Sequence, residues 1–151
     1  MVSPKTPAAA LTAIALLMAL PTASAAAPAQ AAAAFPFGVW RNPQDTVHVE
    51  VRRCGPGACG YVVWASEKAE ADARQGGTDH LVGQQLFQNL EPAAGRQWQG
   101  EIFVPDLGVA LPGTIDQSPE GALVASGCLL GALACKSQSW TRDASAQGRS
   151  N

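Results

Sequence analysis

The residues with the most reactive side chains in this sequence are four cysteines, which form two close pairs, Cys54 with Cys59 and Cys128 with Cys135. As thiolates they could bind a metal, and as oxidised pairs they would close two short loops. Zinc sites favour spacings such as C-x2-C, which the C-x4-C and C-x6-C spacings here fit poorly. Each pair brackets a glycine-containing turn between strand-like runs. We therefore predict two local disulfides, although four cysteines formally allow three connectivities, crossed ones included.

Two histidines and a few carboxylates are the other candidates for chemistry. His48 lies on the polar side of an alternating run, and His80 lies in a loop-like stretch, with no second histidine at metal-ligand spacing. No nucleophile elbow is present to complete a Ser-His-Asp arrangement. Glu50 and Glu101 could act as paired carboxylates, but both occupy polar strand positions where solubility explains them. We expect no catalytic residues, no metal site and no cofactor, so the chain is predicted not to be an enzyme.

The N-terminal residues indicate export. Lys5 gives a short basic head, residues 8–20 form an apolar run, and residues 23–25 form an A-x-A cleavage site. This pattern is typical of a secretory signal peptide, so we predict cleavage after Ala25 and a periplasmic or secreted location. The apolar run is too short to span a bilayer comfortably, and no stable membrane insertion is expected. An exported location agrees with the predicted disulfides, which persist in oxidising compartments.

Charge and length limit the remaining classes of function. The formal net charge is −2, and the only basic pair beyond scattered residues is Arg52-Arg53, which argues against binding to nucleic acid or to an anionic membrane surface. The chain is long enough for one domain. We expect residues 26–36 to form a flexible lead-in, residues 37–143 the domain, and residues 144–151 a disordered tail.

The stretch around the first cysteine pair organises the predicted fold. Residues 46–52 alternate valines with polar residues, the cysteine-bracketed turn reverses the chain, and residues 60–65 return as an apolar strand. Residues 66–75 are rich in alanine and charge, with a serine to cap and glycines to stop a short helix. The remainder consists of evenly spaced short strands. We predict an all-β, antiparallel up-and-down barrel of about eight strands with one short helix, because a meander loses its exposed edges by closing.

Tryptophan motifs lie at both ends of the predicted domain. Gly38-Val39-Trp40 opens the first strand and Trp140-Thr141-Arg142 closes the last, so closure of the barrel makes them neighbours. This pairing resembles the lipocalin pattern, in which the glycine lets the chain bend, the tryptophan plugs one end and the arginine lies across it by a cation–π contact. The resemblance implies that Gly38, Trp40, Trp140 and Arg142 form a barrel plug.

A closer resemblance covers residues 37–142. The motifs that carry it are, in order, Gly38-Val39-Trp40-Arg41, the turn of residues 54–60, Val63-Trp64, residues 127–131 and residues 135–142. As an ordered set they are similar to the exported bacterial family named domain of unknown function 2147. The resemblance implies a lipocalin-like β-barrel in the cell envelope, with no agreed activity and no established catalytic residues.

Binding is the function that we expect from such a barrel, because a small closed barrel can enclose one apolar ligand. The apolar residues that we predict to face the lumen are Val62, Trp64, Phe87, Trp98, Ile102 and Val104. The alternative that these side chains simply fill the interior stays open. We predict binding of a small apolar or amphipathic molecule in the envelope. The alternative function is a protein-binding module, such as a hydrolase inhibitor, that uses the disulfide-stapled turns.

Overall fold

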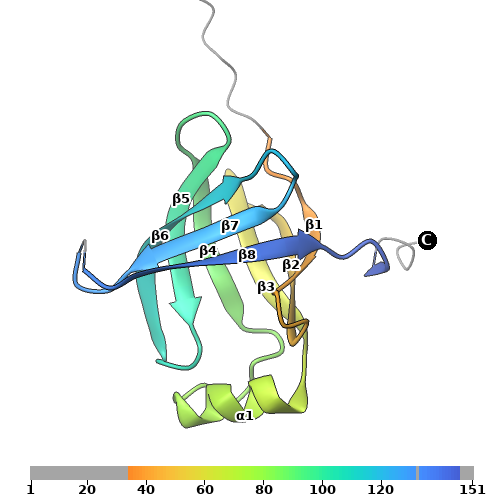
Figure 1. Ribbon diagram of the computed structural model, residues 1–151, viewed down its shortest axis with the longest axis vertical. Coiled ribbons are helices and arrows are strands. Elements are labelled where there is room, and N and C mark those ends of the chain that lie inside the picture. Colours follow the sequence, from red (N-terminus) through yellow and green to blue (C-terminus); the bar gives the residue numbers. More distant parts are fainter. Residues whose placement is uncertain (1–33, 132, 147–151) are drawn as a thin grey trace, which may run out of the picture.

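In the computed structural model, which describes residues 34–131 and 133–146, eight strands form a closed barrel and one helix lies at one end of it (Figure 1). Each strand pairs antiparallel with its neighbour in sequence, and the last strand returns to the first. The predicted up-and-down barrel with a single short helix is confirmed. The elements are β1 (Gly38–Arg41), β2 (Val47–Cys54), β3 (Gly57–Ala65), α1 (Glu67–Gln75), β4 (Gln85–Pro92), β5 (Gln97–Val104), β6 (Val109–Gln117), β7 (Leu123–Cys128) and β8 (Cys135–Arg142).

The folded domain extends beyond the limits predicted from the sequence. The predicted signal peptide, residues 1–25, lies outside the described residues, as do 26–33 of the lead-in and 147–151 of the tail. Phe35, expected in the flexible lead-in, is buried with its ring 4.6 Å from that of Trp98. Ser145, expected in the disordered tail, donates from its hydroxyl and its backbone N–H to Asp143. Aromatic packing of Phe35 and the hydrogen bonds of Ser145 therefore make these residues part of the folded domain.

One end of the barrel is packed solid. Along β2, Val49 and Val51 are buried, since alternate residues of a strand face the same side. Gly60 of β3 is part of this packing, because a Cβ there would lie 2.5 Å from the Phe87 ring and 2.9 Å from Val49. The large side chains buried most completely are Trp40, Trp98, Phe87, Leu90, Ile115, Leu123, Val49, Val51 and Val62. They form a continuous core between the strands.

A bulge in β3 decides which of its side chains face inward. Val49 of β2 pairs with Val62, but the preceding residue, His48, pairs with Trp64, which leaves Val63 as an extra residue. An extra residue changes the alternation of the strand beyond it. Trp64 is therefore 46% exposed, and its ring lies 4.7 Å from that of His48. The prediction that Trp64 faces the lumen is wrong, because period-two counting cannot detect a bulge.

Helix α1 lies across the other end of the barrel, between β3 and β4 (Figure 1). The Ser66 hydroxyl accepts the N–H of Ala69 and caps the helix, as the sequence pattern predicted. Ala73 is fully buried, which gives this short helix one firm contact with the core. The chain thus covers one end of the barrel with a helix.

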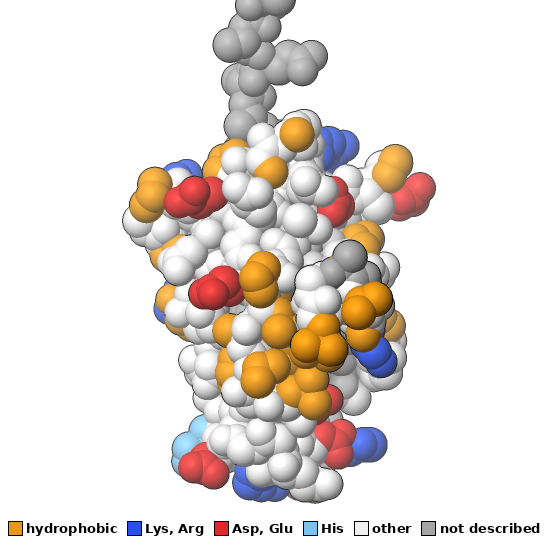
Figure 2. Space-filling model, turned by 90° about the vertical axis from the view of Figure 1, so that its left-hand side faces the viewer, with side chains coloured by type: hydrophobic (Ala, Val, Ile, Leu, Met, Phe, Trp, Pro, Cys, Tyr) orange, Lys and Arg blue, Asp and Glu red, His pale blue; other side chains and the backbone are white. Residues whose placement is uncertain are grey.

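Some large apolar side chains remain at the surface. Leu130 and Leu133 lie in the loop between β7 and β8 and are 84% and 69% exposed. Figure 2 shows hydrophobic side chains gathered on the face from which this loop projects. The barrel therefore carries an apolar surface at one hairpin in addition to its core.

Candidate ligand-binding site

A cavity of about 900 Å³ lies at the end of the barrel that α1 covers. Its wall combines the β1–β2 turn, helix α1, β4, β5, β7 and β8. Buried apolar side chains line it, among them Leu81, Leu86, Phe87 and Trp140. Exposed polar residues such as Gln44 and Gln138 lie on its outer part. The volume falls within the range of roughly 300–1,000 Å³ that is typical of small-molecule sites.

The six predicted lumen residues divide between this cavity, the packed core and the surface. Phe87, Ile102 and Val104 line the cavity. Val62 and Trp98 are 1% and 2% exposed and belong to the packed core, outside the cavity wall. Trp64 lies at the surface, as described above. Of the six residues, three therefore line the cavity, two fill the core and one lies at the surface.

Trp40 and Arg142 lie together at the packed end. Trp40 is fully buried, and the Arg142 guanidinium carbon lies 4.4 Å from the centroid of its ring. Arg142 also donates from Nη1 to the carbonyl of Phe37 at 2.9 Å, and the Trp40 indole N–H donates to the carbonyl of Pro36 at 3.2 Å. Gly38 has a φ of 132°, a backbone conformation that glycine adopts without strain. These contacts hold the start of β1 against the end of β8.

Trp140 does not share this position. Its ring lies 5.6 Å from that of Phe87 at an interplanar angle of 83°, an edge-to-face arrangement that aromatic pairs favour. Trp140 pairs with Leu123, whereas Arg142 pairs with Trp40, so the two residues of β8 have different neighbours. The prediction that Trp140 belongs to the plug is corrected, because it lines the cavity. Its indole N–H is buried and has no hydrogen-bond partner among the described residues.

The barrel closes over a short seam between β1 and β8, where two residue pairs meet. His48 lies beside it, with Nε2 2.7 Å from Asp45 Oδ1 and Nδ1 3.3 Å from Asp143 Oδ2. The Asp143 backbone N–H donates to the carbonyl of Val39 at 2.9 Å. The imidazole therefore links the β1–β2 turn to the end of β8. The sequence pattern predicted that His48 lies on the polar face of its strand. It did not indicate the contact with Asp143, because only the closure of the barrel brings these two residues together.

Hydrogen bonds keep Asp143 ionised next to this histidine. The Ser145 hydroxyl makes the largest contribution to lowering the pKa of the Asp143 carboxyl. Burial opposes this effect by raising the pKa, and the Ser145 N–H and the nearby His48 each make a smaller contribution that lowers it. His48, Asp45 and Asp143 thus form a polar cluster at the seam.

Glu70 attaches helix α1 to the segment that precedes β4. Its Oε2 accepts the backbone N–H of Leu81 and its Oε1 that of Val82, each at 3.1 Å. These two backbone bonds lower the pKa of the Glu70 carboxyl, and the guanidinium of Arg74, 3.7 Å away, adds to the effect. Leu81 lines the cavity, so Glu70 holds both the helix and one wall residue in place.

The far end of the same helix rests on the β5–β6 turn. Thr78 donates from Oγ1 to the carbonyl of Pro105 at 3.1 Å. At Gly76, a Cβ would overlap the backbone of Asp106, so no larger residue fits without a shift of the helix. Together with Glu70, these contacts make α1 a fixed cover of the cavity.

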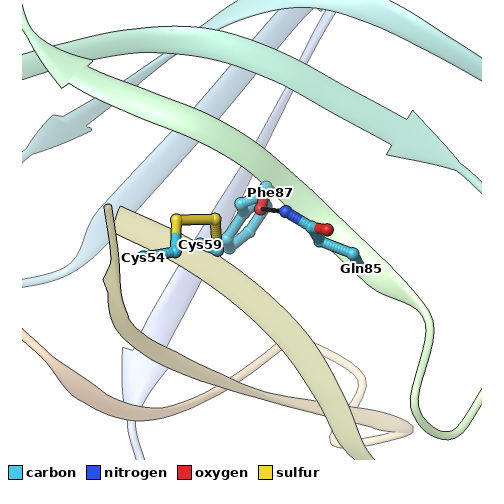
Figure 3. The surroundings of a disulfide bond; sticks show 4 residues. All are labelled: Cys54, Cys59, Gln85 and Phe87. Carbon is cyan, nitrogen blue, oxygen red and sulfur yellow. Dashed lines mark hydrogen bonds between the residues drawn. A yellow bond between two sulfur atoms is a disulfide. The ribbon is translucent and has the colours of Figure 1, made fainter. Parts of the chain in front are cut away.

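Both predicted disulfides are present, Cys54–Cys59 and Cys128–Cys135. No free cysteine occurs among the described residues. Figure 3 shows the first bridge beside Phe87, whose backbone carbonyl accepts a hydrogen bond from the Gln85 side chain at 3.4 Å. This bridge therefore closes the β2–β3 hairpin next to a residue of the cavity wall.

The residues considered from the sequence as catalytic or metal-binding candidates, Glu50, Glu101 and His80, do not lie together in one site. Glu50 lies 4.0 Å from Arg52 on β2, and β3 and β4 separate it from Glu101 on β5. His80 is exposed in the segment before β4. Within residues 34–131 and 133–146, no group of three or more His, Cys, Asp or Glu side chains is arranged to hold a metal ion.

Residues 38–142, from the start of β1 to the end of β8, match the family described as "Uncharacterized protein conserved in bacteria (DUF2147)". The chain belongs to this family. No curated protein matches the sequence significantly. The resemblance identified from the ordered motifs is thus confirmed, and the family description assigns no activity to its members.

A solved structure shows the wider relationship of this DUF2147 barrel. Protein HP1028 from the human pathogen Helicobacter pylori, described as belonging to the lipocalin family, is similar with a TM-score of 0.53. The identity is 13%, over 72% of this chain and 82% of that chain, so the likeness concerns the fold. The fold is therefore lipocalin-like. None of the helices in the described part is long and apolar enough to cross a membrane.

Proposed function

We propose that this DUF2147 protein binds a small amphipathic or apolar molecule in the cavity beneath α1. The observation that carries the proposal is a cavity of about 900 Å³ in a barrel whose other end is packed solid. A packed end with an open end is what a carrier needs, because the core maintains the fold while the cavity accepts the ligand.

The cavity wall favours a ligand with one apolar part and one polar part. Phe87, Ile102 and Trp140 supply apolar contact surface, and Phe87 and Trp140 are nearly inaccessible to water. At the outer part, Lys68 pairs with Asp72 at 2.6 Å, so these two charges largely compensate each other. The apolar end of the ligand would lie against the buried side chains and its polar end toward the surface.

Binding rather than catalysis is proposed because of what lines the cavity. The titratable side chains there are Lys68, Asp72, Asp106 and Lys136. Lys68 and Asp72 form an exposed ion pair, and the hydrogen bond to Asp72 raises the pKa of the lysine, which keeps it protonated. A protonated lysine on an exposed helix is a poor general base.

We also propose that the protein acts outside the cytoplasm. Two disulfides in a chain of this size are typical of the periplasm or the extracellular space. The basic head, apolar run and A-x-A site at the N-terminus supply the corresponding export signal.

Ligand retention and ligand titration test the proposal. Native mass spectrometry of protein purified without detergent should show a bound small molecule. Titration with fatty acids, fatty alcohols and lysophospholipids should change tryptophan fluorescence, since Trp140 lines the cavity. Ala125→Phe, which fills the cavity, should weaken binding at least about tenfold, whereas Ala110→Phe on the exposed part of β6 should not. No retained ligand and no response to the whole panel would contradict the proposal.

The alternative of a protein-binding module stays a prediction. The exposed leucines in the loop closed by Cys128–Cys135 are the observation in its favour. A partner held by this loop should be captured from an envelope extract by the oxidised protein and lost after reduction of the disulfides.

A further inference from the structure

Strand β8 has a free edge beside the cavity. It pairs with β7 from residue 135 to residue 140, but it pairs with β1 only at Thr141 and Arg142. Within the described part of the chain, residues 136–140 therefore have no neighbouring strand on their second side. Exposure agrees with this pairing, since residues 135–139 are all exposed, whereas no residue of β7 is exposed.

The turn after β1 leaves this edge uncovered. β1 ends at Arg41 because Asn42 turns the chain, and its side-chain oxygen accepts two backbone N–H groups of the turn at 2.8 and 3.0 Å. Continuing the pairing of β1 with β8 by two residues would place Pro43 opposite Ser139. Proline has no N–H to donate to a strand ladder. The local sequence therefore stops the closure of the barrel halfway along β8.

Two residues of β8 direct their backbone groups to the free edge. The Asp143 N–H donates to the carbonyl of Val39, so the backbone of Asp143 faces β1. Successive residues of a strand direct their N–H and carbonyl groups to opposite edges, so Thr141, Ser139 and Ser137 face the same side as Asp143. Among residues 34–131 and 133–146, Ser137 and Ser139 have no backbone partner on that side. They present N–H donors and carbonyl acceptors to any strand that approaches.

The free edge is also part of the rim of the cavity. Ser137 and Ser139 line the cavity, to which α1 contributes Lys68 and Asp72. Figure 1 shows β7 on one side of β8 and α1 toward the other, so the free edge faces α1. Residues directly opposite each other in paired strands project to the same face. A strand added here would therefore direct the side chain opposite Trp140 toward the interior, where Trp140 lines the cavity.

We propose that β8 binds an extended peptide segment of a partner protein. The segment pairs antiparallel with residues 136–140 as an added strand and places apolar side chains in the cavity. A peptide strand supplies N–H and carbonyl groups at the spacing that the edge requires, and the cavity selects alternate side chains. The segment uses the same cavity as the proposed small molecule, but its backbone pairing does not depend on binding of that molecule.

The surroundings of the edge favour a single strand that brings no second strand with it. A second copy of this protein would bring its own β7 about 4.8 Å beyond its β8, on the side where α1 and the β1–β2 turn border the cavity. The described ends of the chain are held elsewhere, since Phe35 packs against Trp98 and Ser145 donates to Asp143. A lone extended segment meets neither obstacle.

The edge is prepared for pairing without being generally adhesive. The Cys128–Cys135 disulfide and the ladder with β7 hold β8 in place, so pairing requires little further ordering of this protein. The exposed residues Lys136, Ser137, Gln138 and Ser139 are polar, and polar or charged side chains reduce unspecific association of edge strands. Selectivity then comes from the apolar side chains that enter the cavity.

Amide hydrogen exchange tests the edge in the free protein. The N–H groups of Ser137 and Ser139 should exchange at least about tenfold faster than those of Lys136 and Gln138, which face β7. Equal protection of all four N–H groups would overturn the proposal, because it would mean that the edge is already occupied.

A synthetic peptide tests the pairing. The probe is acetyl-Thr-Val-Thr-Val-Thr-Val-Thr-amide, whose valines share one face and fit the apolar side of the cavity. NMR titration should show saturable binding and slower exchange of the Ser137 and Ser139 N–H groups. N-methylation of the threonines removes the N–H groups that face β8 when the valines point inward, and it should weaken binding at least about tenfold. N-methylation of the valines is the matched control and should leave binding nearly unchanged.

A variant of the edge provides a second comparison. Ser139→Pro removes a free N–H and no ladder bond, so it should abolish peptide binding and change the melting temperature little. Ser139→Ala keeps the backbone and should bind the peptide as the wild type does. No binding of the valine peptide, or equal binding of both methylated peptides, overturns the proposal independently of these variants.

Two further measurements separate the other occupants and the other proposal. Sedimentation should show a monomer, and a dimer that Ser139→Pro dissociates would place a second copy at the edge, which also overturns the proposal. Titration with the fatty acid, fatty alcohol and lysophospholipid panel is run on the same protein. A response to this panel without peptide binding refutes the added strand alone, and peptide binding without a response to the panel refutes the proposed small-molecule ligand alone.

Discussion

The guanidinium of Arg142 lies 4.4 Å from the centre of the Trp40 ring and joins the last strand of the barrel to the first. The seam that it covers consists of two residue pairs, Trp40 with Arg142 and Arg41 with Thr141. Arg142 adds a hydrogen bond to the carbonyl of Phe37 at the start of the barrel. A barrel closed by so short a ladder depends on such side-chain contacts.

Replacement of Arg142 by Met should therefore destabilise the protein. A cation–π contact and a hydrogen bond of this kind together contribute about 1–2 kcal/mol to the free energy of unfolding. Arg52→Met is the matched control, because Arg52 also lies 4.4 Å from an aromatic ring, that of Tyr61, but within the β2–β3 hairpin. Urea denaturation should show a larger loss for Arg142→Met. Equal losses would mean that the seam has no special role.

Acid should weaken the attachment of α1. The hydrogen bonds from Leu81 and Val82 lower the pKa of Glu70 below that of an unfolded glutamate, about 4.3. A group with a lowered pKa contributes stability above its unfolded pKa, and that contribution is lost as the pH falls through its folded pKa. Glu70→Gln should therefore reduce the free energy of unfolding at pH 7, and the difference from the wild type should shrink below about pH 4.

Glu67→Gln provides the comparison for this pH profile, because Glu67 is exposed in the first turn of the same helix. Denaturation at a series of pH values should show a smaller difference from the wild type for this variant than for Glu70→Gln. A Glu70→Gln difference that stays constant from pH 7 to pH 3 would contradict the assigned role of the carboxylate.

The packing at Gly60 should not tolerate even a methyl group. A Cβ there would lie 2.5 Å from the Phe87 ring, and overpacking of this kind costs about 1–3 kcal/mol. Gly127→Ala is the control within the barrel, since a Cβ at Gly127 meets one atom, the Pro112 carbonyl oxygen at 3.8 Å. The melting temperature should fall for Gly60→Ala and change little for Gly127→Ala. The opposite order would disprove the described packing of β3 against β4.

The bulge in β3 predicts different roles for two tryptophans. Trp98→Ala should cost about 3–5 kcal/mol, as is typical for a buried aromatic residue, and Trp64→Ala about 1 kcal/mol or less. Acrylamide should quench a fraction of the wild-type fluorescence that is missing in Trp64→Ala. If Trp64→Ala destabilises as strongly as Trp98→Ala, the exposed position of Trp64 is wrong.

Local features were readable from the sequence because they depend on short-range geometry. The alternation of residues 46–52, the cysteine-bracketed turns and the cap at Ser66 each act over a few residues. They predicted the strands, the disulfides and the helix, and together with the ordered motifs they predicted the barrel and its family. Phe87, Ile102 and Val104 were named as lumen residues from their apolar character and strand position alone.

Other features were decided only by the tertiary structure. Trp64 is outside because one extra residue, Val63, changes the pairing of β3 with β2, and no local pattern marks that position. Trp140 lines the cavity, and Asp143 meets His48, because barrel closure brings β8 to β1 in one particular register. Whether the interior is filled or open depends on how side chains from every strand share one volume, a sum over contacts that are distant in sequence. The sequence by itself determined the barrel fold and its two disulfides. The tertiary structure decided that side chains fill one end of the barrel and leave a cavity at the other.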